Sequence, residues 1–195
     1  YLITERKEYL SAARIYSQQL ASVTPPSSGG DYTQGGRIEA MAILYDWLFD
    51  ELSSAQRTLI ANGIKKTIPL LSDYICGKKN ALNGSWGCTK MPPYPNALDG
   101  HSYQNNKEIL AGVLAIIDEN PQLMPLLQLE FSNFSGVYND VREWVAADGG
   151  FQMGWSYSAN YLSLDSIQLW RSATKNSNLV RDWQGRIIDF YIYMF

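Results

Sequence analysis

The stretch Glu108-Ile-Leu-Ala-Gly-Val-Leu-Ala-Ile-Ile117 decides the fold class, because it indicates a buried helix in the middle of the chain. It follows Asn96-Ala-Leu-Asp-Gly-His-Ser-Tyr-Gln-Asn-Asn-Lys107, which comes from a loop rich in Gly, Pro and Asn. The helix is expected over residues 103–118, ending at Glu119-Asn-Pro121. The single histidine, His101, therefore lies where a polar loop leads into a buried helix.

Helical spacing of apolar residues recurs along the whole chain. In the segment 52–68, Ser53 and Gln56 match the capping-box pattern of a helix start, and Pro69 predicts a kink or break. The other expected helices cover residues 3–20, 36–49, 123–144 with a weak point at 132–136, 156–172 and 178–195. Only residues 187–195 could equally form a strand. Helix hairpins separated by loops predict an all-α fold, an incomplete (α/α) toroid or barrel of antiparallel helix hairpins.

Such a toroid gathers alternate loops on one rim. His101, the pair Gly35-Gly36 and the segment Gly154-Trp-Ser-Tyr157 each fall at an expected junction between a loop and a helix. This placement allows the three segments to share one face, where binding and catalysis concentrate.

The overall composition limits the classes of protein to which this chain can belong. With 195 residues and 46% hydrophobic content, the chain is long enough for one sizeable core. Its 16 basic and 19 acidic residues form no Lys/Arg block, which argues against a nucleic-acid partner. No apolar run reaches the roughly 20 residues that span a bilayer, and no signal peptide is recognised at Tyr1. The abrupt start and end predict a piece of a longer chain.

Cys76 and Cys88 are the only cysteines. A disulfide between them would stabilise the fold by about 3 kcal/mol in the loop-entropy model, and two free buried thiols are the alternative. One histidine and two distant cysteines do not make a tetrahedral zinc site, so no metal is expected.

Tyrosine and tryptophan are abundant, with 13 and 6 residues. Their flat apolar faces with polar edges suit sugar rings, as at Trp86 and Trp155, although core packing explains aromatic residues equally well. For His101, too, a structural and a functional interpretation are both open. It is either a helix-boundary residue or a group whose pKa near neutrality serves acid–base chemistry.

Three segments together resemble heparinase II/III-type polysaccharide lyases. They are Leu44-Tyr-Asp-Trp-Leu-Phe-Asp-Glu-Leu-Ser-Ser-Ala-Gln-Arg57, Gly100-His-Ser-Tyr-Gln-Asn-Asn106 with its following helix, and Asp148-Gly-Gly-Phe-Gln-Met-Gly-Trp-Ser-Tyr157. They occur in the family's order. The resemblance implies that residues 1–195 form a single α/α toroid domain, a fragment of a longer secreted or periplasmic chain whose C-terminal β-sandwich domains are absent here.

The resemblance also implies β-elimination on a uronic-acid polysaccharide without a cofactor. Tyr157 would be the general acid and in part the base, and His101 would neutralise the uronate carboxylate or share the base role. Some relatives have Glu where this chain has Gln104, which can hydrogen-bond a carboxyl group but holds no charge. The expected partners are an acidic polysaccharide and the parent chain's C-terminal domain, which supplies a second histidine in the family. The substrate-binding candidates are Gln104, Asn105, Tyr161, Trp155, Trp86 and Arg171.

Two other function classes stay open. A glycoside hydrolase on a similar α/α scaffold needs two carboxylates about 5–10 Å apart, and Glu39, Asp46 and Asp148 are the candidates. Of these, Asp46 is expected to anchor a helix instead. A non-catalytic carbohydrate-binding domain would keep the aromatic residues and would need neither Tyr157 nor His101.

Overall fold

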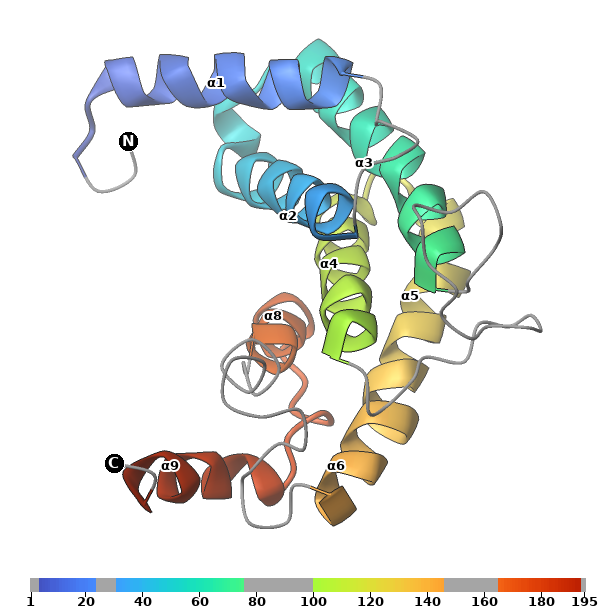
Figure 1. Ribbon diagram of the computed structural model, residues 1–195. Coiled ribbons are helices and arrows are strands. Elements are labelled where there is room, and N and C mark those ends of the chain that lie inside the picture. Colours follow the sequence, from blue (N-terminus) through green and yellow to red (C-terminus); the bar gives the residue numbers. More distant parts are fainter. Residues whose placement is uncertain (1–3, 24–30, 76–99, 146–164, 194–195) are drawn as a thin grey trace.

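In the computed structural model, helices make up all the regular structure of the described residues, 4–23, 31–75, 100–145 and 165–193 (Figure 1). The predicted all-α class is therefore confirmed for this part of the chain. The elements in order are α1 (Lys7–Ser22), α2 (Asp31–Trp47), the 3₁₀ turn η1 (Phe49–Glu51), α3 (Ser54–Ile75), α4 (Gly100–Ile116), the 3₁₀ turn η2 (Pro121–Leu123), α5 (Met124–Ser132), the π-helical segment η3 (Asn133–Tyr138), α6 (Asn139–Val145), α8 (Asp165–Thr174) and α9 (Trp183–Tyr193).

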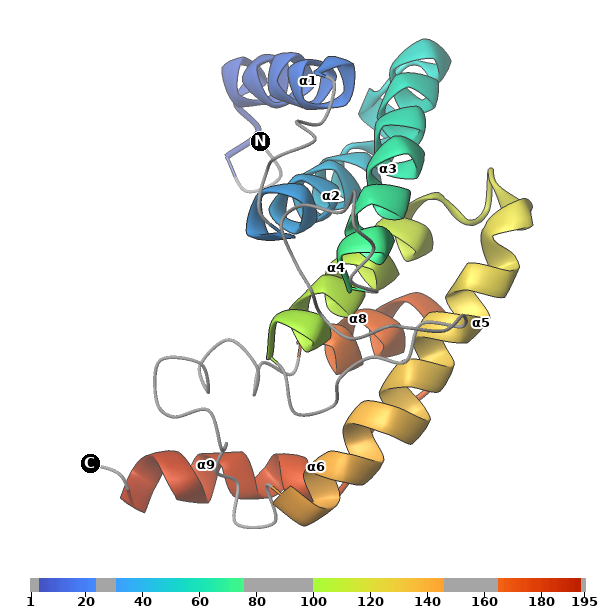
Figure 2. The same ribbon diagram turned by 45° about the vertical axis from the view of Figure 1, so that its right-hand side comes forward.

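Helix α4 is the central element. It packs against α2, α3, α5 and α8, while α1 packs on α2 and α3 at the N-terminal end. Figure 2 shows α5, η3 and α6 as one long rod beside α4, with α9 near the end of that rod. The largest part of the core forms where α2, α3 and α4 meet. Its fully buried members include Ile38, Met41, Ile60, Ile64, Leu110, Val113 and Ile116.

Helices α2 and α4 approach closely because each contributes a glycine to their contact, at positions about one turn apart. A Cβ on Gly112 would lie 2.5 Å from Ile38 Cγ2, and a Cβ on Gly35 would collide with the Glu108 carboxylate. Gly35 and Gly36 were expected at a junction between a loop and a helix. That expectation is wrong, because both residues lie inside α2, where Gly35 makes room for α4.

Helix α3 begins as predicted. The Ser53 N–H donates to Gln56 Oε1 at 2.9 Å, and the Gln56 N–H donates to Ser53 Oγ at 3.3 Å, which is the reciprocal capping box. The expected break at Pro69 is wrong, because α3 continues to Ile75. Pro69 is exposed while Ile68 and Leu71 are buried in the core, so packing on both sides offsets the lost hydrogen bond.

The expected helix over 123–144 exists, and its predicted weak point coincides with a change of helix type. Residues Asn133–Tyr138 are π-helical between α5 and α6. Near the C-terminus the alternative of a strand is wrong as far as Tyr193, because Trp183–Tyr193 form α9. Among the described residues, no helix is both long and apolar enough to cross a membrane.

Candidate functional site

The first two turns of α4 carry the polar residues that the sequence singled out. His101 and Gln104 are half-buried, whereas Asn105 is only 1% exposed. The helix already begins at Gly100, so His101 lies within its first turn. An imidazole held on regular helix has a more defined position than one on a loop.

A buried hydrogen-bond network fastens this end of α4 to η3. Asn106 Nδ2 donates to Tyr138 Oη at 2.9 Å and to the Ser102 carbonyl at 2.7 Å. Tyr138 Oη also bonds Ser102 Oγ at 2.9 Å, and Asn133 Nδ2 donates to Asn106 Oδ1 at 3.1 Å. Buried and mutually satisfied groups of this kind make a local structure rigid. We call Ser102, Asn106, Asn133 and Tyr138 the amide–hydroxyl network.

The π-helical geometry of η3 is part of this arrangement. It places Asn133 and Tyr138, the first and last residues of the segment, in hydrogen-bonding contact with the same helix. Single π-helical turns within α-helices are frequent at functional sites.

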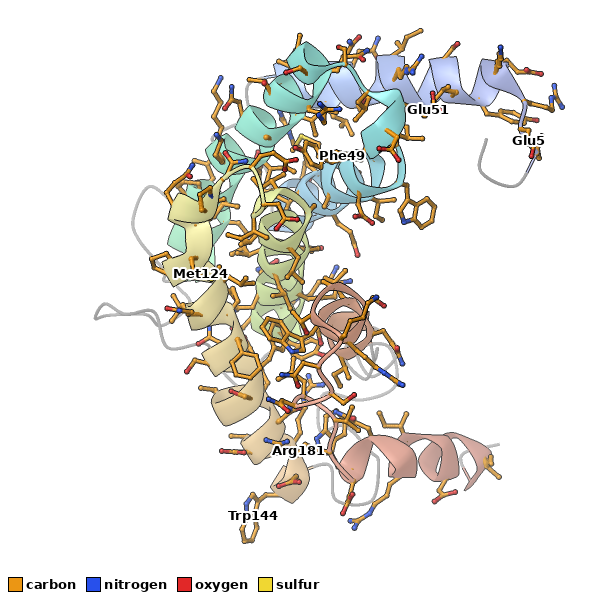
Figure 3. All side chains as sticks on the ribbon, turned by 180° about the vertical axis from the view of Figure 1, so that it is seen from behind. Glu5, Phe49, Glu51, Met124, Trp144 and Arg181 are labelled. Carbon is orange, nitrogen blue, oxygen red and sulfur yellow. The ribbon has the colours of Figure 1, made fainter. Side chains whose placement is uncertain are left out.

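A second buried contact lies beside the network. The guanidinium of Arg142 is fully buried and lies 3.9 Å from the centroid of the Tyr103 ring, while Tyr103 Oη bonds Ser166 Oγ at 2.7 Å. Burial lowers the pKa of Arg142, but a guanidinium remains protonated in proteins. Arg142 therefore places a positive charge behind the first turns of α4. Two residues further on, Trp144 projects into solvent (Figure 3).

Glu130 extends the amide–hydroxyl network at its other end. Its side chain is 2% exposed and hydrogen-bonds with Asn133, but burial is the larger effect and raises the pKa of Glu130 to about 8. Within the described part of the chain, Glu130 Oε2 has no hydrogen-bond partner. The carboxyl is therefore mainly protonated at neutral pH.

Gln104 has a specific partner on the next turn. Its Nε2 donates to Glu108 Oε1 at 3.0 Å, and Glu108 is 1% exposed. A glutamate at position 104 would place a second carboxylate against this buried one, which costs free energy unless one of the two is protonated. The neutral amide is thus the side chain that fits beside Glu108.

The other predicted site residues are distributed as follows. Arg171 lies in the last turn of α8 and is exposed. Tyr157, Trp155, Tyr161, Trp86, Cys76 and Cys88 lie outside the described residues. The structure thus brings together His101, Gln104 and Asn105 on α4, which their spacing already implied.

Several residues of this region were missed by sequence reasoning, namely Asn133, Tyr138, Glu130 and Ser166. Each acts through a partner more than 25 positions away or through burial, as in the pairs Asn106–Asn133 and Tyr103–Ser166. The one available signal was the pair Ser102 and Asn106, four residues apart on the buried side of a helix whose second half is apolar.

Two of the carboxylates considered for a hydrolase, Glu39 and Asp46, lie on α2. Glu39 Oε1 pairs with Lys107 Nζ at 3.1 Å. Asp46 is exposed and makes no hydrogen bond or ion pair with any described residue, so the expectation that it anchors a helix is wrong. The two residues are seven positions apart on α2, so their backbone positions are about 10.5 Å apart along the helix axis, just beyond the separation of about 5–10 Å that a hydrolase needs.

Comparison with known proteins adds no relative. No family model matches the chain, and neither a curated protein nor a solved structure matches it. Its function is therefore proposed from its own residues and from the resemblance of its three segments.

Proposed function

We propose that this chain is the toroid portion of a polysaccharide lyase that cleaves a uronic-acid-containing polysaccharide, such as a glycosaminoglycan or an alginate-like polymer, by β-elimination. One observation supports this most strongly. Half-buried His101 and Gln104 lie on a helix end that buried hydrogen bonds hold to η3. Partly accessible polar groups on a rigid support meet the geometric demands of catalysis.

The reaction breaks the C5–H bond, forms the C4=C5 double bond and expels O4 from C4. The C5 proton is acidic only if the adjacent carboxylate is neutralised, because negative charge develops on that group as the proton leaves. In this proposal His101 donates to the uronate carboxylate, and Gln104 supplies a neutral hydrogen bond beside it. Tyr157 accepts the C5 proton as phenolate and returns a proton to O4 as the leaving group departs.

The positive charge of Arg142 would support this reaction indirectly. It is buried against Tyr103, so it contacts no substrate itself, but its field extends through a low-dielectric interior. A positive potential at this end of α4 favours the anionic uronate and a tyrosine in its phenolate form. Arg142 is therefore a positioning residue in this scheme.

The remaining parts of the proposal follow from the resemblance. The described helices would belong to an incomplete toroid, and residues 1–195 would be one domain of a longer periplasmic or secreted chain. Substrate contacts would come from Asn105, Trp86, Trp155, Tyr161 and Arg171, with a second histidine supplied by the C-terminal domain.

One assay tests the reaction class. The full-length protein is incubated with a panel of uronate polysaccharides while ultraviolet absorbance of the new C4–C5 double bond and the yield of reducing ends are followed. We expect both signals to rise together on at least one polymer. New reducing ends without the absorbance would indicate a hydrolase, and binding without cleavage would indicate a carbohydrate-binding domain. Either result would overturn the proposal.

A further inference from the structure

A pocket with a volume of about 290 Å³ lies between α2, α4 and α8, at some distance along α4 from His101. The three helices come from separate parts of the sequence and are neighbours in Figure 1. The volume lies near the lower end of the range for small-molecule sites. It suits a ligand of about one ring with a short substituent.

Small side chains create this space. Ala111 and Ala115 are one turn apart on α4 and line the pocket together with Ala42 of α2 and Ala173 of α8. Leu114 and Leu169 complete an aliphatic interior. These side chains offer no hydrogen-bond partners, so this part of the pocket favours the apolar body of a ligand.

The charged groups at the pocket have a negative sum. Glu39 and Asp46 contribute two carboxylates, and Lys107 contributes one ammonium group. Lys107 is already paired with Glu39 at 3.1 Å. This leaves the exposed carboxylate of Asp46 without an ion-pair partner among the described residues. The pocket is thus complementary to a cation.

Trp47 supports the same conclusion independently. It follows Asp46 on α2, lines the pocket and is 62% exposed. An indole face attracts an organic ammonium group more strongly than the other aromatic rings do. A carboxylate and an indole at the edge of an aliphatic pocket are together suited to an amine that carries an apolar group.

From this combination we infer that the pocket binds a small organic cation, with its apolar body between α2, α4 and α8 and its ammonium group at Asp46 and Trp47. This site is separate from the proposed lyase site. It does not depend on the lyase reaction, so the two proposals can fail independently.

Isothermal titration calorimetry of the full chain with phenethylammonium tests the inference. We expect saturable binding, with phenethyl alcohol binding about tenfold more weakly, because the alcohol keeps the apolar body and loses the charge. The anion 3-phenylpropionate should not bind. Equal affinity for the amine and the alcohol, or no binding of the amine, would overturn the proposal.

Variants locate the site. Asp46→Asn and Trp47→Ala should each weaken amine binding several-fold, and both positions are exposed, so the fold should persist. Asp50→Asn makes the same charge change at an exposed position outside the pocket and should leave the affinity unchanged. Ala115→Leu should fill the pocket and abolish binding of both compounds. Equal losses in the Asp46 and Asp50 variants would show that net charge, not this pocket, binds the amine.

Discussion

The carboxylate of Glu108 occupies the space next to Gly35 where a side chain would begin. A Cβ on Gly35 would lie 1.4 Å from Glu108 Oε2 and 2.2 Å from its Cδ. Glu108 is buried and accepts a hydrogen bond from Gln104, so it has little freedom to move away. This contact couples the packing of α2 to the polar end of α4.

The contact predicts opposite effects for two adjacent glycines. Gly35→Ala should destabilise the protein by about 1–3 kcal/mol, because Glu108 must leave its place and its bond to Gln104. Gly36→Ala should stabilise it by about 0.5–1 kcal/mol, since Gly36 lies in the same helix with nothing within 4 Å of the added carbon. Urea denaturation measures both. Equal effects at the two positions would refute the role given to Glu108.

Removing one hydroxyl tests the amide–hydroxyl network. Tyr138→Phe should lower the free energy of unfolding by about 1–3 kcal/mol, because Asn106 and Ser102 lose a common buried partner. Tyr16→Phe is the matched control, since Tyr16 is 53% exposed and its hydroxyl remains accessible to water. Chemical denaturation of both variants gives the comparison. A loss in the control as large as that in Tyr138→Phe would contradict the prediction.

Glu130 makes stability depend on pH. The pKa of this carboxyl is raised to about 8 by burial, above its ordinary value of 4.5. Between these two values the folded chain holds a proton that the unfolded chain releases, so the free energy of unfolding should fall as the pH rises. Glu130→Gln keeps the shape and removes the titration. Its denaturation midpoint should therefore decline less than that of the wild type between about pH 5 and about pH 8.

A control variant separates the titration of buried Glu130 from the general effect of removing a carboxylate. Glu143→Gln removes an exposed carboxylate on α6, so it should retain the wild-type dependence on pH. The prediction is wrong if Glu130→Gln and the wild type show parallel profiles over this range.

The proposed chemistry predicts distinct losses at two residues. Tyr157→Phe should abolish lyase turnover with the helical circular dichroism unchanged, because no phenol remains to exchange protons with C5 and O4. His101→Asn should lower kcat by about 10²–10⁴-fold while keeping a hydrogen-bonding side chain. Tyr9→Phe, at a half-exposed position on α1, should be fully active. Near-wild-type turnover in Tyr157→Phe would exclude that tyrosine as the acid.

Local patterns predicted the features that depend on neighbouring residues in the sequence. The helical class follows from apolar spacing, the start of α3 from Ser53 and Gln56, and the irregularity within 123–144 from weak helix formers at 132–136. These properties depend only on residues within one or two helical turns, so they can be predicted before the fold is known.

Features set by distant partners could not be predicted in this way. Gly35 is a breaker by local rules, but it lies inside α2, where Glu108, 73 positions away, occupies the space that a side chain would take. Pro69 remains in α3 because the core holds Ile68 and Leu71. The role of Asn106 depends on Asn133 and Tyr138, whose positions only the packed structure defines.

The π-helical turn also fixes the length of the chain between α5 and α6. A π-helical turn holds about one residue more than an α-helical turn, so removal of one residue from Asn133–Tyr138 can convert the segment to regular α-helix while α6 keeps its direction. Arg142 is then expected to stay on Tyr103, whereas Asn133 and Tyr138 can no longer both reach Asn106. A deletion of a single codon here is thus expected to weaken the amide–hydroxyl network while it leaves α6 in place.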